Sequence, residues 1–453
     1  MRIAILSIGS EGDIRPYIAL GRELQSPRHS DPPHEVHIVT HPNARSRVLD
    51  AGLNFADIGG DPVSALADSE LGRAVSEAGV FGKMSATKAF FSALIEDWFE
   101  RGQRALESIE PHFCVLGTFP MNIHSVLCSR VLKIPYCQIH LMPIVATSEH
   151  APPVGYGDGQ TSFNFMARFK WNLSFKIGYK LLYASTLSRL YKPLGVSISH
   201  SKVMTEWTDA PAVLGYSTTL SPRPSDYDES KVKIVGAMLE GHSDEDVARF
   251  VETEDGRRIA KYLGATSKPF VFVGFGSMWD TLAKREKQRL LGEIMDSTKV
   301  LKDVARFIIQ IDEECADEAR KSTTLDCSDS ILVSKAPHGW LFPQMDVVVC
   351  HGGSGTTHRA ILHGCATVVC PCKVEDSDQP FWAGCVERAK LGVRGPNMRN
   401  LSSARLAECI RQSLSPSIKA AVKIASEEMK KQDGVRDGAK VILNDFAQKK
   451  TVA

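Results

Sequence analysis

Residues 351–357 read His-Gly-Gly-Ser-Gly-Thr-Thr, a combination of glycines and hydroxyl residues that is suited to binding a negatively charged group. The run 346–350 before them is apolar and β-branched, which is typical of a strand buried on both faces of a parallel sheet. If a tight turn and a helix follow, free N–H groups and the positive end of the helix dipole face whatever lies above the strand. The turn is therefore a candidate phosphate or pyrophosphate site, in which His351 adds a donor, and a merely tight turn is the alternative.

The helix after this turn is expected to be capped by Ser354 or Thr356, to run to His363 and to stop at Gly364. The spacing is not Walker A, because no Lys-Ser or Lys-Thr follows, and it is not the dinucleotide fingerprint G-x-G-x-x-G. An NAD oxidoreductase is disfavoured on that ground, because neither half of the chain contains the fingerprint.

A second group of interest lies in the turn Gly-Ser-Glu-Gly-Asp-Ile-Arg-Pro over 9–16. A helix is predicted to begin near Pro16, since proline is preferred in the first helical turn. Asp13 would then lie above the carboxyl end of the first strand, where open α/β sheets bind their ligands. The alternative is that Asp13 only caps the helix.

Strands and helices alternate along the chain and would position both turns. Strands are expected at 3–8, 36–40, 114–116, 136–140, 268–274, 305–310, 331–333 and 346–350. This alternation predicts an α/β protein with two Rossmann-like halves, each built on a parallel sheet. We expect an N-terminal domain at 1–215, an interdomain connection at 216–265, a C-terminal domain at 266–400, and a tail of two helices within 401–453.

Composition narrows the classes of function. The chain has 453 residues and a net charge of +1, and nothing in it resembles a zinc finger or an RNA-binding signature, so nucleic acid is not an expected partner. The apolar start is too short for a signal peptide, and no run is long enough to span a bilayer. Eleven scattered cysteines favour a reducing, cytoplasmic setting, and the pair Cys370-Pro-Cys372 is read as two thiols, with no metal expected.

The sequence segments before and after the glycine turn make its pattern more specific. Ala336-Pro-His338 and Trp340-Leu-Phe-Pro343 precede it, and Asp378-Gln-Pro-Phe-Trp382 follows. This combination resembles the donor-sugar signature of family 1 glycosyltransferases with the GT-B fold, in the branch of sterol and lipid glucosyltransferases and related antibiotic glycosyltransferases. The resemblance implies two Rossmann-like domains whose parallel sheets face a central cleft.

The resemblance also extends to the first turn, which is similar to the G-S-x-G-D-x-x-P segment of that branch. Carried over, Asp13 becomes the candidate general base that takes the proton of the acceptor hydroxyl. Glu11 stands where the family usually has Arg, which reverses a charge beside the site. The loop 371–378 is longer than in the family. Glu375 and Asp376 within it are expected to be solvated, and the alternative is that they reach the sugar.

Donor contacts follow from the same resemblance and from the chemistry of the side chains. Asp378 and Gln379 would bond the hydroxyls of a sugar, because an acceptor and a mixed donor and acceptor suit a polyol. The diphosphate would be held without a metal by the turn, and the base and ribose by the segment 336–338. The donor-binding candidates are Ser277, Ala336, His338, His351, Gly353, Ser354, Gly355, Thr356, Asp378 and Gln379.

The segment 163–192 is rich in aromatic and basic residues, and 159–205 contains no Asp or Glu. Such a segment could lie on an anionic membrane surface or roof an apolar acceptor pocket. The alternative is a helical pair that packs its aromatic residues inside.

The sequence therefore predicts an inverting transferase that moves a hexose, in first place glucose from UDP-glucose, to a hydroxyl of a lipophilic acceptor such as a sterol. A secondary-metabolite aglycone, another UDP-sugar such as UDP-N-acetylglucosamine, and a non-catalytic binding protein for nucleotide sugars or lipids remain as alternatives. We expect no cofactor other than the UDP-sugar co-substrate, and a tail that crosses back onto the first domain as the family's does.

Overall fold

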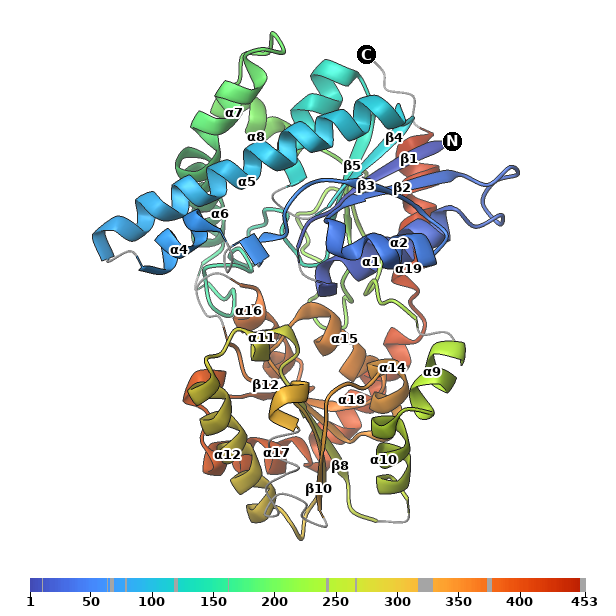
Figure 1. The fold of residues 1–453 in the computed structure, drawn as a ribbon, viewed down its shortest axis with the longest axis vertical. Helices are drawn as coiled ribbons and strands as arrows, with labels where there is room; N and C mark the ends of the chain where they lie inside the picture. Colours follow the sequence, from blue (N-terminus) through green and yellow to red (C-terminus); the bar gives the residue numbers. More distant parts are fainter. Residues whose placement is uncertain are drawn as a thin grey trace.

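The structure is a computed structural model of the chain, and Figure 1 shows its two stacked halves. It describes residues 1–9, 11–62, 64–65, 69–77, 80–117, 121–161, 163–241, 244–264, 267–316, 329–372 and 377–448. Glu375 and Asp376 lie outside these ranges, and so does the side chain of Glu11.

The first half is built on a parallel sheet in the order β3-β2-β1-β4-β5-β6-β7. Its strands are β1 (Arg2–Leu6), β2 (Glu35–Thr40), β3 (Asn54–Asp57), β4 (Phe113–Leu116), β5 (Tyr136–His140), β6 (Ala212–Leu214) and β7 (Val232–Ile234). Its helices are α1 (Glu11–Leu24), α2 (Arg45–Asp50), α4 (Glu70–Glu77), α5 (Val80–Ile109), α6 (Asn164–Gly178), α7 (Ala184–Tyr191) and α8 (His200–Thr208). Because alternate strand residues face opposite sides, Ile3 and Ile5 join one core, and Ala4 and Leu6 join the other.

The second half repeats this plan with the strand order β10-β9-β8-β11-β12-β13. Its strands are β8 (Phe270–Gly274), β9 (Arg306–Gln310), β10 (Ser330–Val333), β11 (Val347–Cys350), β12 (Ala366–Val369) and β13 (Gly392–Arg394). Its helices are α9 (Asp244–Val251), α10 (Glu254–Tyr262), α11 (Ser277–Asp280), α12 (Lys284–Val300), α14 (His338–Leu341), α15 (Ser354–Leu362), α16 (Gln379–Arg388), α17 (Ser403–Ser413) and α18 (Pro416–Met429). The predicted α/β class with two parallel, Rossmann-like sheets is confirmed.

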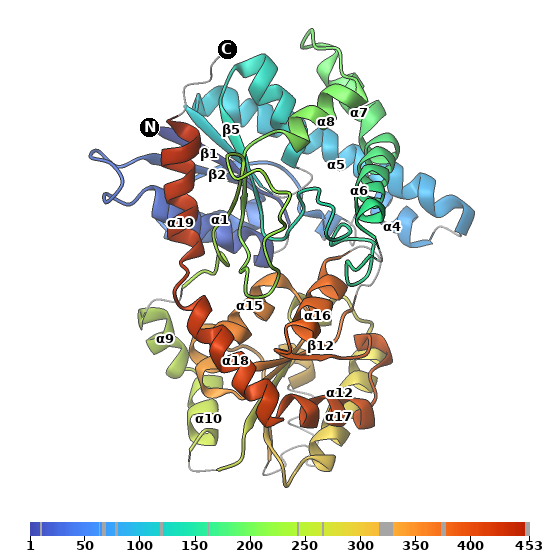
Figure 2. The ribbon, with the colours of Figure 1, turned by 180° about the vertical axis from the view of Figure 1, so that it is seen from behind.

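The chain ends against the first half, as the two opposite views in Figures 1 and 2 show for α19 (Gly434–Lys440). Ile442, Leu443 and Phe446, in the helical turns after α19, share a hydrophobic core with Ile3 and Ile14. The tail holds three helices, α17, α18 and α19, so the prediction of two was wrong. Asp433, whose side chain accepts the N–H of Arg436, caps the start of the additional helix.

Helix α1 begins at Glu11, so the predicted start near Pro16 was also wrong. Acidic residues at 11 and 13 lie in the first turn of the helix, where the positive end of the dipole favours negative charge. Pro16 is tolerated inside the helix and leaves the carbonyl of Gly12 without the usual N–H partner from residue 16.

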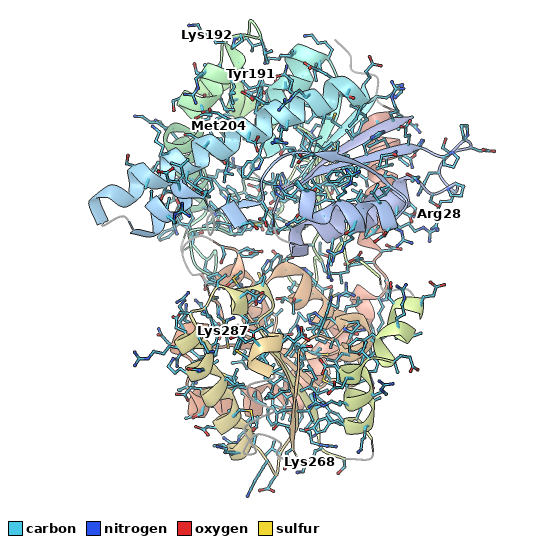
Figure 3. The ribbon with its side chains drawn as sticks, viewed as in Figure 1. Arg28, Tyr191, Lys192, Met204, Lys268 and Lys287 are labelled. Carbon is cyan, nitrogen blue, oxygen red and sulfur yellow. The ribbon has the colours of Figure 1, made fainter. Side chains whose placement is uncertain are left out.

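None of the described helices combines the length and the apolar composition that crossing a bilayer requires. Figure 3 shows the side chains on this framework, with Tyr191 and Met204 in the upper half and Lys287 in the lower half.

Candidate functional site at the junction of the two halves

The glycine turn between β11 and α15 has the predicted form. Gly352 has a φ of +92°, a conformation that side chains other than glycine rarely adopt, and an added Cβ there would lie 2.5 Å from Val369. Helix α15 starts at Ser354 and ends at Leu362, and Gly364 follows with a φ of +79°, which confirms the predicted stop. The turn therefore presents the first N–H groups of a helix beyond the carboxyl end of a buried strand.

The expected hydroxyl cap was wrong. Gly353 is the N-cap and no side chain caps the helix. The hydroxyl of Ser354 instead donates to the carbonyl oxygen of Leu141 in the first half, at 3.0 Å. Because the hydroxyl of Ser354 bonds across the interface between the halves, it is not directed at a ligand. Backbone N–H groups would therefore hold any anion that binds here.

His351 lies at the end of β11, with its Nε2 atom 2.6 Å from where a Cβ on Gly353 would be. Burial lowers the pKa of His351 to about 4, and the nearby backbone of Phe275 offsets only part of that effect, so the ring is neutral at pH 7. Its buried Nδ1 atom has no hydrogen-bond partner among the described residues. A neutral ring with an unused polar atom is suited to a hydrogen bond with a ligand, but it adds no positive charge.

Asp13 lies on the opposite half, in the first turn of α1, and its side chain is exposed. Its carboxylate turns back toward Gly9, where an added Cβ would lie 2.6 Å from Oδ2. Gly9 in turn donates its N–H to Nε2 of the buried His41 at 3.2 Å, and Nδ1 of His41 lies 2.8 Å from the carbonyl oxygen of Gly59. His41, whose pKa is lowered by burial, thus orders the turn that carries Asp13.

Asp378 immediately precedes α16 and lies close enough to Asp13 for the two carboxylates to interact. Burial raises the pKa of Asp378 to about 6, a hydrogen bond from Trp382 opposes that rise, and the negative charge of Asp13 adds to it. Trp382 donates its indole N–H to Oδ2 of Asp378 at 2.6 Å. The charge of Asp13 on the first half thus acts on Asp378 on the second, and Asp378 has a strongly perturbed pKa, as is frequent at functional sites.

Gln379 is buried beside Asp378, and one of its polar atoms has a structural role. Its Oε1 accepts the N–H of Cys372 at 2.8 Å, which joins the two ends of the loop 373–376. Of this predicted pair, Asp378 is thus the residue whose electrostatics point to a ligand.

The remaining predicted donor residues lie on neighbouring turns of the second half. Ser277 is exposed at the start of α11, behind Gly276 with its φ of +52°. The adjoining Trp279 donates to Asp312 at 2.7 Å, and Lys287 donates to the same oxygen at 2.6 Å. Burial alone would raise the pKa of Asp312, but these donors hold it at about 2. This charged pair fixes the short helix that carries Ser277.

The segment 334–336 is held by Asp255, whose Oδ2 accepts the backbone N–H and the hydroxyl of Ser334 at 2.7 and 2.8 Å. Ala336 is buried, and the ring of His338 stacks on Phe342 with centroids 4.4 Å apart. Trp340 packs edge to face against Phe250 of α9, so it takes part in the core. Gly355 and Thr356 lie in the first turn of α15.

Sequence reasoning missed His358, a buried residue that ties α15 to the first half. Its Nδ1 lies 2.7 Å from the carbonyl oxygen of Ser354, and its Nε2 accepts the N–H of Ser217 at 3.2 Å. Its ring meets Trp382 edge to face at 4.8 Å. Burial lowers the pKa of His358 to about 4, so the neutral ring can donate from Nδ1 and accept at Nε2.

Among the residues that the structure describes, no three His, Cys, Asp or Glu side chains gather as a metal site would require. The second half thus contributes the glycine turn, which can bind an anion, and the polar residues Asp378 and Gln379. The first half contributes the exposed carboxylate of Asp13. That arrangement can hold a phosphorylated ligand and accept a proton from a second one.

Comparison with known proteins shows which proteins the chain is similar to. Residues 3–128 match the glycosyltransferase family 28 N-terminal domain. A sterol 3-beta-glucosyltransferase of Saccharomyces cerevisiae is 26% identical over 456 residues, covering 100% of this chain and 36% of the yeast protein. One from Arabidopsis thaliana is 26% identical and covers 96% of this chain and 66% of its own length. The chain thus spans about a third of the length of the yeast relative.

Solved structures extend the comparison of folds. The glycotransferase of kitacinnamycin superposes with a TM-score of 0.69 at 17% identity, covering 98% of this chain and 99% of its own. The calicheamicin glycosyltransferase CalG4 gives a TM-score of 0.69 at 15% identity, covering 99% and 98%. The predicted resemblance is confirmed: the chain has the GT-B fold, its residues 3–128 match the glycosyltransferase family 28 N-terminal domain, and it is similar along its whole length to sterol 3-beta-glucosyltransferases.

Proposed function

We propose that this protein is an inverting glycosyltransferase that moves glucose from UDP-glucose to a hydroxyl group of a sterol or similar lipophilic acceptor. The observation that carries the proposal is the glycine turn at the start of α15, with its positive φ at Gly352, on the half opposite to Asp13, whose charge acts on Asp378 next to α16. The relatedness to sterol 3-beta-glucosyltransferases supports the choice of donor and acceptor.

The donor would bind to the second half. Backbone N–H groups at Gly353, Ser354, Gly355 and Thr356 and the positive end of α15 would hold the diphosphate, with His351 as a neutral donor. Following the family resemblance, Ser277 would contact the diphosphate, the 336–338 segment would hold the base and ribose, and Asp378 and Gln379 would bond the sugar hydroxyls. The helix end and these N–H donors give the leaving group stabilisation that calls for no metal.

The acceptor would bind against the first half, with its hydroxyl at Asp13. As the acceptor oxygen attacks the anomeric carbon, its proton passes to the Asp13 carboxylate and the bond from that carbon to the diphosphate oxygen breaks. The electron pair of the broken bond leaves with UDP. A single displacement of this kind inverts the configuration at the anomeric carbon.

The cellular location of this reaction is inferred from the chemistry of the acceptor and from the state of the cysteines. Sterols partition into bilayers, so the acceptor would be met at a membrane surface. Ten described cysteines are buried, and none of them is in a disulfide, which favours the reducing cytoplasm.

The test is turnover of UDP-glucose by the purified protein with a panel of sterols, following UDP release. Asp13→Asn should lower kcat by roughly 100- to 10,000-fold, the usual worth of a general base, and leave UDP-glucose binding intact. Asp50→Asn, a change at an exposed residue at the end of α2, is the matched control. Unchanged turnover in Asp13→Asn would remove this residue from the mechanism. Binding of UDP-glucose without turnover on any acceptor would instead indicate a binding protein.

A further inference from the structure

Helix α6 exposes a row of large apolar side chains that no part of the described chain covers. Phe165, Phe169, Leu173 and Ile177 retain 70%, 62%, 37% and 46% of their exposure, and Phe163 just before the helix retains 61%. Four residues spaced by four lie along one side of a helix and span about 18 Å at 1.5 Å per residue. Isolated exposed apolar residues are ordinary, but a continuous row marks an interaction surface.

A polar and basic row runs beside the apolar one. Arg168, Asn172, Lys176 and Lys180 follow at the same spacing, and all four are exposed. Arg168 is paired with Asp226 at 2.9 Å, whereas Lys176 and Lys180 form no ion pair with any described residue. The whole stretch 159–205 contains no acidic residue, so the face of α6 is apolar and positive at once.

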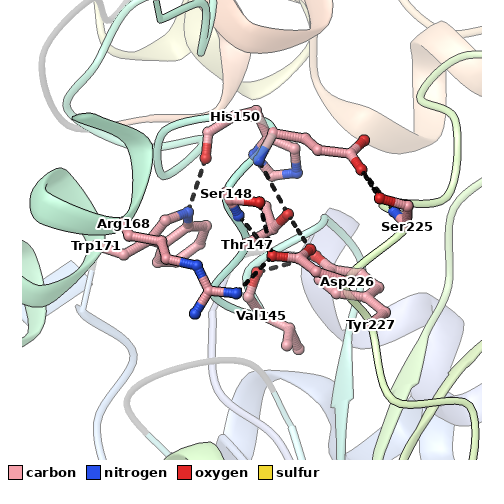
Figure 4. Close-up of polar contacts among 10 residues, drawn as sticks. Val145, Thr147, Ser148, His150, Arg168, Trp171, Ser225, Asp226 and Tyr227 are labelled. Atoms are coloured by element: carbon pink, nitrogen blue, oxygen red, sulfur yellow. Dashed lines mark hydrogen bonds and ion pairs between the residues drawn. The ribbon is translucent and has the colours of Figure 1, made fainter. Parts of the chain in front are cut away.

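The opposite side of α6 is held firmly, as Figure 4 shows. Trp171 is buried and donates its indole N–H to the carbonyl oxygen of His150 at 2.8 Å. Asp226, which accepts from Arg168, also accepts the hydroxyls of Thr147 at 2.5 Å and Ser148 at 2.9 Å. Trp171 on the inner face and Arg168 in the exposed basic row thus have partners of their own, whereas the apolar row stays exposed.

We propose that the face defined by Phe165, Phe169, Leu173, Ile177 and Lys176 of α6, with Lys180 in the π-helical turn that follows, docks the protein on an anionic lipid bilayer. An apolar row that enters the boundary between headgroups and acyl chains, with lysines at the level of the lipid phosphates, is how an amphipathic helix binds in the plane of a membrane. A second copy of the chain fits less well, because a twofold contact along this row would bring the unpaired lysines of both copies together.

The docking face is connected to the site at the junction. Trp171 of α6 bonds to His150, and the ring of His150 lies 5.6 Å from that of Phe381. Phe381 belongs to α16, the helix that Asp378 precedes. A lipid that leaves the bilayer at α6 would therefore emerge near α16, the helix that the proposed sugar-binding Asp378 precedes. The docking face goes beyond the proposed transfer reaction and does not depend on it, since membrane binding can be measured without turnover.

The test is flotation of the purified chain with vesicles of phosphatidylcholine alone and of phosphatidylcholine with phosphatidylserine. The wild type should bind the anionic vesicles more tightly. Lys176→Gln with Lys180→Gln should weaken that binding by roughly 30-fold, since each cationic side chain near an anionic surface is worth about fivefold, and leave binding to neutral vesicles unchanged. Phe165→Ser with Phe169→Ser should weaken binding to both kinds of vesicle by at least about tenfold.

Ile424→Ser is the matched control, because Ile424 is 69% exposed on α18 of the other half. Its binding should equal that of the wild type, and circular dichroism should show all variants folded. Equal binding by the wild type and the phenylalanine variant would overturn the proposal. So would a dimer in solution that dissociates only in the phenylalanine variant while no form binds vesicles. Turnover with an acceptor in detergent micelles keeps this result separate from the transfer reaction.

Discussion

Replacement of Asp378 by Asn should stabilise the protein and damage its activity at the same time. The pKa of Asp378 is about 6, against 3.8 for an unperturbed aspartate. Because a tenfold change in proton affinity corresponds to about 1.4 kcal/mol, the ionised carboxylate lowers the free energy of unfolding by about 3 kcal/mol at pH 7.5. Asn is neutral and keeps an oxygen for the indole N–H of Trp382, so it removes this penalty and retains the contact.

The pH dependence of this effect has a definite sign. Below pH 3.8 the carboxyl group is protonated in both states, and wild type and variant should differ little from this cause. Between 3.8 and about 6 the unfolded chain releases the proton that the folded chain keeps, so the advantage of the variant grows with pH and then levels off above 6. Thermal unfolding should show a Tm higher by roughly 3–6 °C at pH 7.5, the lower figure if the whole chain unfolds at once and the higher if one half unfolds alone, and by about half of that at pH 5.

Activity should move in the opposite direction. A carboxylate that bonds a sugar hydroxyl contributes about 1.5–3 kcal/mol, so kcat/KM for UDP-glucose should fall roughly 10- to 100-fold in Asp378→Asn. In the wild type kcat/KM should decline as the pH falls below 6, where Asp378 becomes protonated. A Tm that drops at pH 7.5, or a gain that is the same at both pH values, would refute the reasoning and make Asp378 a structural partner of Trp382 only.

Three further predictions concern the turn and the interface. Gly352→Ala should lower the Tm and weaken UDP binding more than about tenfold, because φ at this position is +92° and the new Cβ meets Val369. Gly355→Ala is the comparison: a Cβ at Gly355 has no atom within 4 Å, so this variant should leave the Tm unchanged or raise it. His358→Ala should lower the free energy of unfolding at pH 7.5 by about 3 kcal/mol, because the buried N–H of Ser217 loses its acceptor and Trp382 loses a contact. The wild type should lose stability as the pH falls from 6.5 to 4. His140, His351 and His358 have pKa values of about 4 in the folded protein, so they stay neutral there while the same histidines in the unfolded chain bind protons. Thermal unfolding at a series of pH values checks this prediction.

The sheets and the glycine turn could be predicted from the sequence because their causes are local. A β-branched run such as 347–350 suits a strand covered on both faces, and its alternate residues do join two different cores. The positive φ of Gly352 and Gly364 follows from residue type and position alone. The start of α1 was misplaced because Pro16 was given more weight than the two acidic residues before it.

The roles of Ser354, His358 and His41 could not be predicted, because their partners are distant in the chain. Ser354 bonds to Leu141 across 213 positions, and His358 accepts from Ser217 across 141. Neither the periodicity nor the residue spacing of the sequence around α15 indicates those long-range contacts. The signals for His41 were its place directly after the second strand, at the edge of the sheet where ligands bind, and the family resemblance of Thr40-His41, and neither indicated its contacts with Gly9 and Gly59.

These contacts give α15 two functions that cannot be separated. Its N-terminal turn presents the N–H groups proposed to hold the diphosphate, while Ser354, His358 and Arg359 bind the first half through Leu141, Ser217 and the carbonyl oxygen of Glu240. Any change in how the halves pack must therefore move the anion-binding turn, and any ligand on the turn must act on the packing. Because Asp13 lies on the other half, the distance between the proposed base and the donor is set by this helix. Substitutions at the interface should accordingly alter kcat and KM together, even though they touch neither substrate.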